Sequence, residues 1–264
     1  PLEVWPDNCI NRTSKEHVKP VRQKWFGVAC CPPNIARTLA SMGQYIYFTD
    51  KNTAYVNLYI SNEAQIELEE GTLKIQMESD LTNTGHISMT VIPEEGGSHD
   101  LALRIPDYVK NYVIRKDGMI QEHTDICQSY LKIEGVDKQT EVTIDFEVPV
   151  RFVRANPNVR EDAGKVALVK GPLVNCLEET DNGENLPSIF VSTNQEVEET
   201  FEPELLGGVT TLRLKGKRLH TWQDGALYDA REPEFEEVEL KAIPYHCWDN
   251  RKTGEMLVWM KEMF

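Results

Sequence analysis

The clearest chemical signal in this sequence is a pair of adjacent cysteines in the segment Cys30-Cys31-Pro32-Pro33-Asn34. The segment precedes a predicted helix, whose N-terminus carries partial positive charge that stabilises a thiolate and lowers its pKa. Cys31 precedes a proline, so we expect an extended backbone there that presents both sulfurs to one point. Deprotonated thiols in that arrangement favour a borderline-soft metal ion, and zinc is the natural choice. Two ligands do not complete a zinc site, so at least one or two more must come from elsewhere.

The remaining thiols have simpler explanations than catalysis or metal binding. Cys9 lies in a polar segment and is expected to be a loop thiol. Cys127, Cys176 and Cys247 lie in strand-like segments, where cysteine packs as a small apolar side chain. His123 and Cys127 have a spacing that suits a metal, but a solvated loop leading into a strand explains it more simply. The adjacent pair also has a structural alternative, that of two buried thiols.

One helix is predicted directly after the cysteines, over residues 33–47. Ile35, Leu39, Met42 and Ile46 are spaced by 4, 3 and 4 positions, which places them on one face, and we expect that face to be buried. Proline is tolerated in the first turn of a helix, because the backbone amide there has no partner to lose. The two cysteines would then precede the first turn of this helix.

Beyond the helix the hydrophobic period changes to two, which indicates β-strands. The first set of predicted strands covers residues 55–60, 65–68, 73–78, 87–92, 101–105, 112–116, 130–133 and 141–146. The second set covers residues 151–154, 165–170, 173–177, 209–214 and 238–243, with a last strand at 256–260. Many short strands separated by turn signals are typical of antiparallel sandwiches.

The predicted fold class is therefore mainly β, with two antiparallel, jelly-roll-like β-sandwich domains. The first sandwich is assigned to residues 48–150 and the second to 151–250, with the boundary in the stretch 149–157. Residues 178–207 are rich in Glu, Asn, Gly and Pro, and we expect an exposed loop region there. Residues 251–264 are assigned to a terminal strand, and its return to the first sandwich is left open.

The composition excludes several classes of function. The chain has 264 residues and a formal net charge of −15 with scattered Lys and Arg, which argues against nucleic-acid binding. No apolar run approaches the roughly 18 residues needed to cross a membrane. Six irregularly spaced cysteines are too few for a disulfide framework, so we expect free thiols and a reducing, cytoplasmic compartment. The first residue is Pro1, so we expect the chain to begin partway through a longer protein.

The cysteine segment resembles the signature of glycoside hydrolase family 127, the cysteine glycosidases typified by β-L-arabinofuranosidase. The similar residues run Trp25-Phe26-Gly27-Val28-Ala29-Cys30-Cys31-Pro32-Pro33-Asn34-Ile35-Ala36-Arg37. The resemblance covers the whole chain, and it continues in Tyr45-Ile46-Tyr47, Tyr55-Val56-Asn57-Leu58-Tyr59, Leu103-Arg104-Ile105-Pro106, Lys170-Gly171-Pro172-Leu173-Val174, Ile243-Pro244-Tyr245, Trp248 and Asn250-Arg251.

The resemblance implies a catalytic (α/α) barrel followed by β-sandwich domains, with residues 1–47 as the tail of the barrel and its last helix. The family hydrolyses with retention through a covalent thioglycosyl intermediate, and Glu and Cys residues hold a zinc ion. Cys30 corresponds to the nucleophile, which is also a zinc ligand, and Cys31 to a second zinc ligand. The usual two-carboxylate glycosidase attacks with Asp or Glu instead.

The same resemblance implies that much of the active site lies upstream of Pro1. The general acid, the other Glu and Cys ligands and the sugar-binding histidines belong to that part, and no Glu-x-Cys pair occurs in this chain to replace them. The substrate would be a β-L-arabinofuranoside or a related sugar, and the missing barrel would be the partner of this chain. We expect the chain alone to be inactive and to bind zinc weakly or not at all.

Several neighbours of the motif have both a functional and a structural interpretation. Asn34 could cap the helix or hold the cysteine turn, and Arg37 could reach a thiolate or form an ordinary ion pair. A set of aromatic side chains could stack on sugars or pack between barrel and sandwich: Tyr45, Tyr47, Tyr55 and Tyr59. Trp248 and Trp259 are expected to be core residues, and the acidic stretch 232–239 a solvated surface.

A function from a different class is a non-catalytic β-sandwich module that supports a barrel or binds carbohydrate. Such a module has no need of the Cys-Cys-Pro-Pro-Asn segment, so this segment discriminates between the two functions. A thiol-based metal or redox protein is disfavoured, because no Cys-x-x-Cys occurs.

Overall fold

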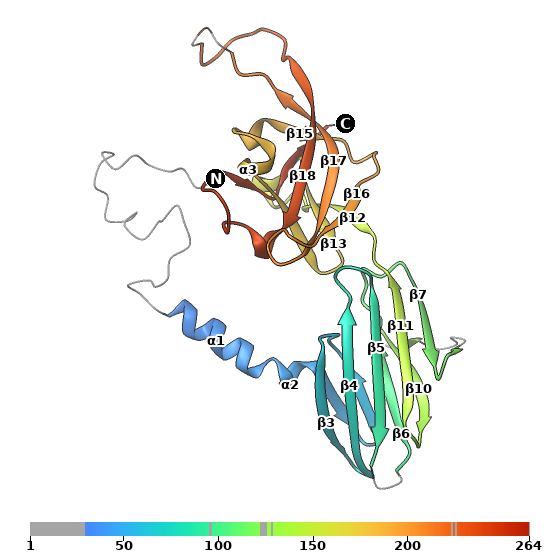
Figure 1. Ribbon diagram of the computed structural model, residues 1–264. Helices are drawn as coiled ribbons and strands as arrows, with labels where there is room; N and C mark the ends of the chain where they lie inside the picture. Colours follow the sequence, from blue (N-terminus) through green and yellow to red (C-terminus); the bar gives the residue numbers. More distant parts are fainter. Residues whose placement is uncertain are drawn as a thin grey trace. The chain divides into compact units, whose positions relative to one another are not determined.

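The computed structural model describes residues 30–94, 97–121, 126–127, 129–222, 224 and 226–263, with the backbone alone for 126–127. These residues form two compact units, 30–149 and 150–263 (Figure 1). Some of the residues discussed above lie outside the described residues: Cys9, residues 25–29, His123 and the side chain of Cys127. The expectations placed on them stay predictions.

The predicted helix is present but differs at both ends. Helix α1 spans Cys31–Ser41 and helix α2 spans Gly43–Ile46, with both prolines in the first turn of α1. The expected extension of Cys31 is wrong, because Cys31 is the first residue of α1 and Cys30 before it is also helical (φ −75°, ψ −34°). The preference of a pre-proline residue for an extended backbone is steric and not absolute, and prolines in the first turn cost the helix no hydrogen bond.

The expectation that the apolar face of this helix is buried is wrong for most of its length. No residue of α1 is buried, and Ile35 and Leu39 are 62% and 66% exposed. Only Ile46, at the end of α2, packs into the interior. The spacing identified the apolar face correctly, but no described part of the chain lies over that face.

The first unit is a sandwich of two sheets. Its strands are β1 (Tyr47–Asp50), β2 (Thr53–Val56), β3 (Asn62–Leu68), β4 (Gly71–Asp80), β5 (His86–Pro93), β6 (His99–Arg104), β7 (Asn111–Lys116), β8 (Met119–Ile120), β9 (Ile126–Cys127), β10 (Tyr130–Val136) and β11 (Thr140–Glu147). One sheet has the order β1-β2-β6-β10-β9 and the other β3-β4-β5-β11-β7-β8. All pairs are antiparallel except β2 with β6, which run parallel.

Alternation along each strand builds one core between the two sheets. On β4, Leu73, Ile75 and Met77 are buried, while the intervening Lys74 and Gln76 are exposed. The inward side chains of β5, β6, β10 and β11 join the same apolar cluster. Burying one such side chain stabilises the fold by roughly 1.5–3 kcal/mol, so the two-residue period that predicted these strands is also what holds the sheets together.

The second unit is built from one nine-stranded sheet. Its elements are β12 (Val150–Arg154), η2 (Arg160–Asp162), β13 (Lys165–Lys170), β14 (Leu173–Glu178), α3 (Glu179–Asn182), η3 (Leu186–Ser188), β15 (Ile189–Val191), β16 (Glu198–Glu202), β17 (Val209–Leu219), β18 (Phe235–Pro244), η4 (Tyr245–Cys247), β19 (Met256–Leu257) and β20 (Met260–Glu262). Strand β13 pairs with both β14 and β20, so six strands close into a ring, β13-β20-β15-β17-β18-β14. The apolar core lies inside that ring.

Residues 178–207 are not the exposed loop region that their composition suggested. They contain α3, η3, β15 and β16, and three of their apolar side chains are fully buried: Leu186, Ile189 and Val191. The ion pairs of Arg251 with Glu178 and Asp181 fix the start of this segment. The few apolar residues thus decide the fold of a segment that is mostly polar.

The chain's end also stays within the second unit. Strand β20 pairs antiparallel with β13 and parallel with β15, and β19 pairs with β14. Residues 251–264 therefore do not return to the first sandwich, the alternative that the sequence had left open. Trp248 and Trp259 are partly buried and not the core residues that we expected, with Trp248 packed against a small cluster around Cys176 and Cys247. The acidic stretch 232–239 is almost wholly exposed, as expected.

The mainly β fold class is confirmed. In the described part of the chain, α3 is the only α-helix beyond residue 48, and it has four residues. No described helix is both long and apolar enough to cross a membrane.

Candidate active site

The two adjacent cysteines lie side by side at the start of α1. Both are exposed, and their Sγ atoms are 3.9 Å apart. This excludes the structural alternative of two buried thiols within the described residues. Because Cys30 is helical and Cys31 begins the helix, the first turn of α1 rather than an extended segment presents both sulfurs on one side.

Asn34 holds the cysteine turn and does not cap the helix. Its Nδ2 donates to the carbonyl oxygen of Cys30 over 2.8 Å, and Thr38 Oγ1 donates to the Asn34 carbonyl over 2.9 Å. Arg37 donates to Asn34 Oδ1 over 2.9 Å, so the described structure shows it braced against the asparagine and not bonded to a thiolate. A short local network, Cys30–Asn34–Arg37, therefore orients the backbone that carries the first sulfur.

The neighbouring sulfur of Cys30 affects the ionisation of Cys31. The pKa of the Cys31 thiol is raised above its ordinary value, first because Cys30 shares a hydrogen bond with it and second because charge on Cys30 repels a second thiolate. This direction is opposite to the lowering expected from the helix N-terminus. Two ionised thiols this close require a compensating positive charge. A cation between them would supply it.

The spacing of the sulfurs suits a tetrahedral zinc ion. With Zn–S bonds of about 2.3 Å, two sulfur ligands of a tetrahedral zinc lie roughly 3.8 Å apart. The observed separation of 3.9 Å therefore needs little adjustment. In the described ranges, no three His, Cys, Asp or Glu side chains come together as a metal site. Cys30 and Cys31 thus fit as two members of a ligand set and not as a whole one.

Three of the four tyrosines near the motif pack on the sandwich. Tyr59 is buried, donates to the Arg104 carbonyl oxygen over 2.7 Å and meets Phe146 edge-on. Tyr47 is half-buried beside the core, and Tyr55 meets Tyr130 edge-on. Tyr45 is 50% exposed, so it alone of these four retains the exposure that stacking on a sugar requires.

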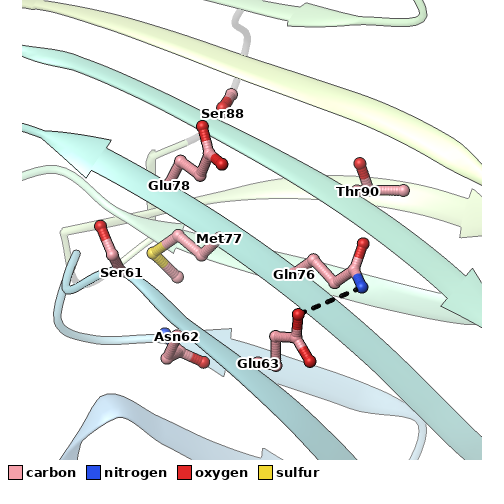
Figure 2. Close-up of a pocket in the computed structure, with 8 residues that line it drawn as sticks. All are labelled: Ser61, Asn62, Glu63, Gln76, Met77, Glu78, Ser88 and Thr90. Atoms are coloured by element: carbon pink, nitrogen blue, oxygen red, sulfur yellow. Dashed lines mark hydrogen bonds between the residues drawn. The ribbon is translucent and has the colours of Figure 1, made fainter.

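A second candidate site, which the sequence did not suggest, lies on the outer face of β3, β4 and β5. It is a shallow groove of about 570 Å³ (Figure 2). Its lining consists of Ser61, Asn62, Glu63, Gln76, Met77, Glu78, Ser88 and Thr90. Glu63 accepts a long hydrogen bond of 3.5 Å from Gln76 across the groove. The sequence signal for this groove is weak. It consists of polar residues at every second position of the three strands, a pattern that any solvent-exposed sheet face has.

Comparison with known proteins identifies relatives over both units. Residues 53–150 match the family described as beta-L-arabinofuranosidase, GH127 middle domain. Residues 150–261 match the family described as glycoside hydrolase family 127 C-terminal domain. The two matches meet at residue 150, where the two compact units also divide.

Individual relatives agree with these family matches. A non-reducing end beta-L-arabinofuranosidase of Bifidobacterium longum subsp. longum is 37% identical over 98% of this chain and 41% of that protein. The crystal structure of a GH127 beta-L-arabinofuranosidase from Geobacillus stearothermophilus T6 superposes with a TM-score of 0.88 at 42% identity, over 100% of this chain and 42% of that one. A GH127 beta-arabinofuranosidase gives a TM-score of 0.83 at 30% identity, over 92% and 40%. The chain thus spans about two fifths of the length of these relatives.

Proposed function

This chain belongs to glycoside hydrolase family 127, as a C-terminal portion, and on that premise we propose that the whole protein is a retaining glycosidase that cleaves β-L-arabinofuranosides or related sugars. The observation that carries the proposal is the pair of exposed thiols at the start of α1, with Sγ atoms 3.9 Å apart. The substrate class comes from the relatives that are named as arabinofuranosidases.

Cys30 and Cys31 would hold two of the four positions around a zinc ion, and the other ligands would come from the upstream part of the protein. When bound, zinc would keep both thiols deprotonated at neutral pH. The pair itself lacks such a positive charge, and Cys30 raises the pKa of the Cys31 thiol beside it. Asn34 and Arg37 would keep the Cys30 backbone in place while the sulfur reacts.

In the proposed reaction Cys30 Sγ attacks the anomeric carbon of the sugar. A C–S bond forms as the C–O bond to the leaving group breaks, and the leaving oxygen takes a proton from an upstream carboxylic acid. Water then attacks the same carbon, the carboxylate accepts its proton, and the C–S bond breaks to return the thiolate. Two inversions at one carbon give net retention.

The stereochemical course tests this proposal. We expect the whole protein to release arabinose from a β-L-arabinofuranoside with the β anomer appearing first, followed by slow mutarotation, as read from the anomeric signals in proton NMR. The 264-residue chain should release none. First appearance of the α anomer, or hydrolysis by the 264-residue chain alone, would contradict the mechanism.

A second candidate function is carbohydrate binding by the first sandwich, favoured by the groove on β3, β4 and β5. Its hydroxyl, amide and carboxylate groups can both donate hydrogen bonds to sugar hydroxyls and accept them. Two glutamates disfavour an anionic ligand, and the one apolar residue of the lining, Met77, is itself a buried core residue. A neutral oligosaccharide is the ligand class that suits these groups.

We expect Gln76→Ala combined with Glu78→Ala to weaken binding of an arabinan oligosaccharide to the 264-residue chain by about tenfold, because each lost hydrogen bond contributes about 0.5–1.5 kcal/mol. The matched control is Gln65→Ala with Glu67→Ala, the same residue types exposed on β3 outside the lining. Isothermal titration calorimetry measures both. Equal affinity of the two double variants, or no binding by the unaltered chain, would exclude a sugar site in the groove.

A further inference from the structure

The junction between α2 and β1 attaches the cysteine-bearing helix to the sandwich. Ile46, the last residue of α2, is buried, and its carbonyl oxygen accepts the backbone amides of Asn57 over 2.9 Å and Leu58 over 3.3 Å. Both donors directly follow strand β2. The end of α2 is thereby tied to a segment of the sandwich that lies beyond β1 and β2 in the chain.

The side chain of Asn57 completes this attachment with both ends of its amide. Asn57 Nδ2 donates to the carbonyl oxygen of Tyr45 over 3.0 Å, and Asn57 Oδ1 accepts the Tyr130 hydroxyl over 3.0 Å. Tyr130 belongs to β10 and packs edge-on against Tyr55, with ring centroids 5.3 Å apart. We call Tyr45, Ile46, Asn57 and Tyr130 the junction latch. It joins two consecutive carbonyls of α2 to two strands of one sheet.

The latch is the main restraint on α1 among the described residues. No residue of α1 is buried there, and its side-chain hydrogen bonds from Asn34, Arg37, Thr38 and Ser41 stay within the helix and Cys30. Met42, between the two helices, keeps helical dihedral angles (φ −57°, ψ −36°), so α1 and α2 continue one another without an open hinge. Within the described residues, the contacts that fix the direction of α1 relative to the first sandwich therefore lie beyond its C-terminal end, in α2.

A small tilt of the helix at the junction latch displaces the two sulfurs by a distance that matters for metal binding. Cys31 precedes Ile46 by 15 positions, which corresponds to roughly 22 Å of helix. A tilt of about 1.3° over that length moves the thiols by roughly 0.5 Å, which is the tolerance of a preorganised site. Metal ligand distances tolerate about 0.2 Å.

We propose that Asn57, oriented by the Tyr130 hydroxyl, is a positioning residue that aims Cys30 and Cys31 at the zinc ion and the sugar. The inference rests on the proposed function, since it concerns the same two thiols. It gives a role to two segments that resemble the family, 45–47 and 55–59, whose residues include no catalytic group. Neither Asn57 nor Tyr130 touches the reacting atoms.

The test uses Asn57→Ala and Tyr130→Phe in the whole protein. We expect Asn57→Ala to weaken zinc binding by about tenfold or more, the range found when groups that orient metal ligands are removed, measured by competition with a chelator of known affinity. Turnover should fall while KM changes little. Tyr130→Phe should have a smaller effect in the same direction, because Asn57 Nδ2 still bonds to Tyr45.

The matched control is Tyr59→Phe, which removes a buried hydroxyl that donates to the Arg104 carbonyl oxygen in the same sandwich. It should lower the melting temperature yet leave zinc affinity unchanged. Wild-type zinc affinity in Asn57→Ala, or an equal loss of zinc in Tyr59→Phe, would overturn the inference. A wild-type protein that binds no zinc would contradict the proposed function itself, before any variant is compared.

Discussion

Replacing Cys30 with serine in the whole protein is expected to lower turnover by roughly 10⁴-fold or more, the scale seen when an attacking nucleophile is removed. Serine has a similar shape, but its hydroxyl does not ionise near neutral pH, whereas a thiolate beside a metal ion is fully formed. Substrate binding should survive better than turnover, since we propose that most sugar contacts come from the upstream domain. Steady-state kinetics on an aryl β-L-arabinofuranoside measures both quantities.

The control for this substitution is Cys176→Ala. Cys176 is a described free thiol whose burial in the second unit raises its pKa to about 12, so it is inert at neutral pH. Its removal should lower stability and leave turnover intact. If Cys30→Ser retained a tenth or more of the wild-type turnover, the nucleophile would have to be a different residue.

Loss of zinc is the second large expected effect, and replacing either Cys30 or Cys31 should cause it. We expect the whole protein to hold one zinc ion per chain and to lose it on Cys31→Ser, because a tetrahedral site that loses one thiolate loses both charge and a bond. The 264-residue chain should bind zinc weakly or not at all, since its described residues bring only two suitable ligands together. Elemental analysis after dialysis measures the zinc content of the whole protein and of the 264-residue chain, each with and without Cys31→Ser.

A stoichiometric zinc ion in the 264-residue chain that persists after Cys31→Ser would contradict this prediction. It would mean that the metal is held by side chains other than the adjacent pair. Zinc in the 264-residue chain that is lost on Cys31→Ser would instead mean that the chain holds more ligands than its described residues bring together. The zinc content of the four proteins therefore separates these cases.

The strands were predictable because burial acts on each of them separately. Leu73, Ile75 and Met77 alternate with exposed polar residues on β4, and the same two-residue period marks most of the other strands. The pairing of strands far apart in sequence follows from no local pattern. Closure of the second sheet through β13, and the parallel pairs β2–β6 and β15–β20, are of this kind.

Composition was a poor guide where few apolar residues determine the fold. Between residues 178 and 207 the polar majority predicted a loop, yet Leu186, Ile189 and Val191 insert into the core and order the segment. The face of α1 shows the converse case. Its spacing identified an apolar face, but the predicted burial of that face is wrong, because burial needs a surface to pack against and the described residues provide none for Ile35 and Leu39.

The candidate site was predictable in its residues and not in its geometry. Adjacent thiols before a helix identified Cys30 and Cys31, and the resemblance supplied their proposed roles. Three features of the site depend on atomic distances that residue spacing does not encode. They are the helical start at Cys31, the hydrogen bond from Arg37 to Asn34 and the raised pKa of Cys31. The role of Asn57 could not be predicted from the sequence either, because an asparagine after a strand has many ordinary roles.

The attacking atom is identified most directly by mass spectrometry of the whole protein after reaction with an arabinofuranose-configured covalent inhibitor. We predict one added sugar-derived mass per chain, located on Cys30 by fragmentation of the peptide that contains both cysteines. The label should be absent from Cys30→Ser. A label on Cys31, or on a glutamate, would contradict the assignment of Cys30 as the nucleophile.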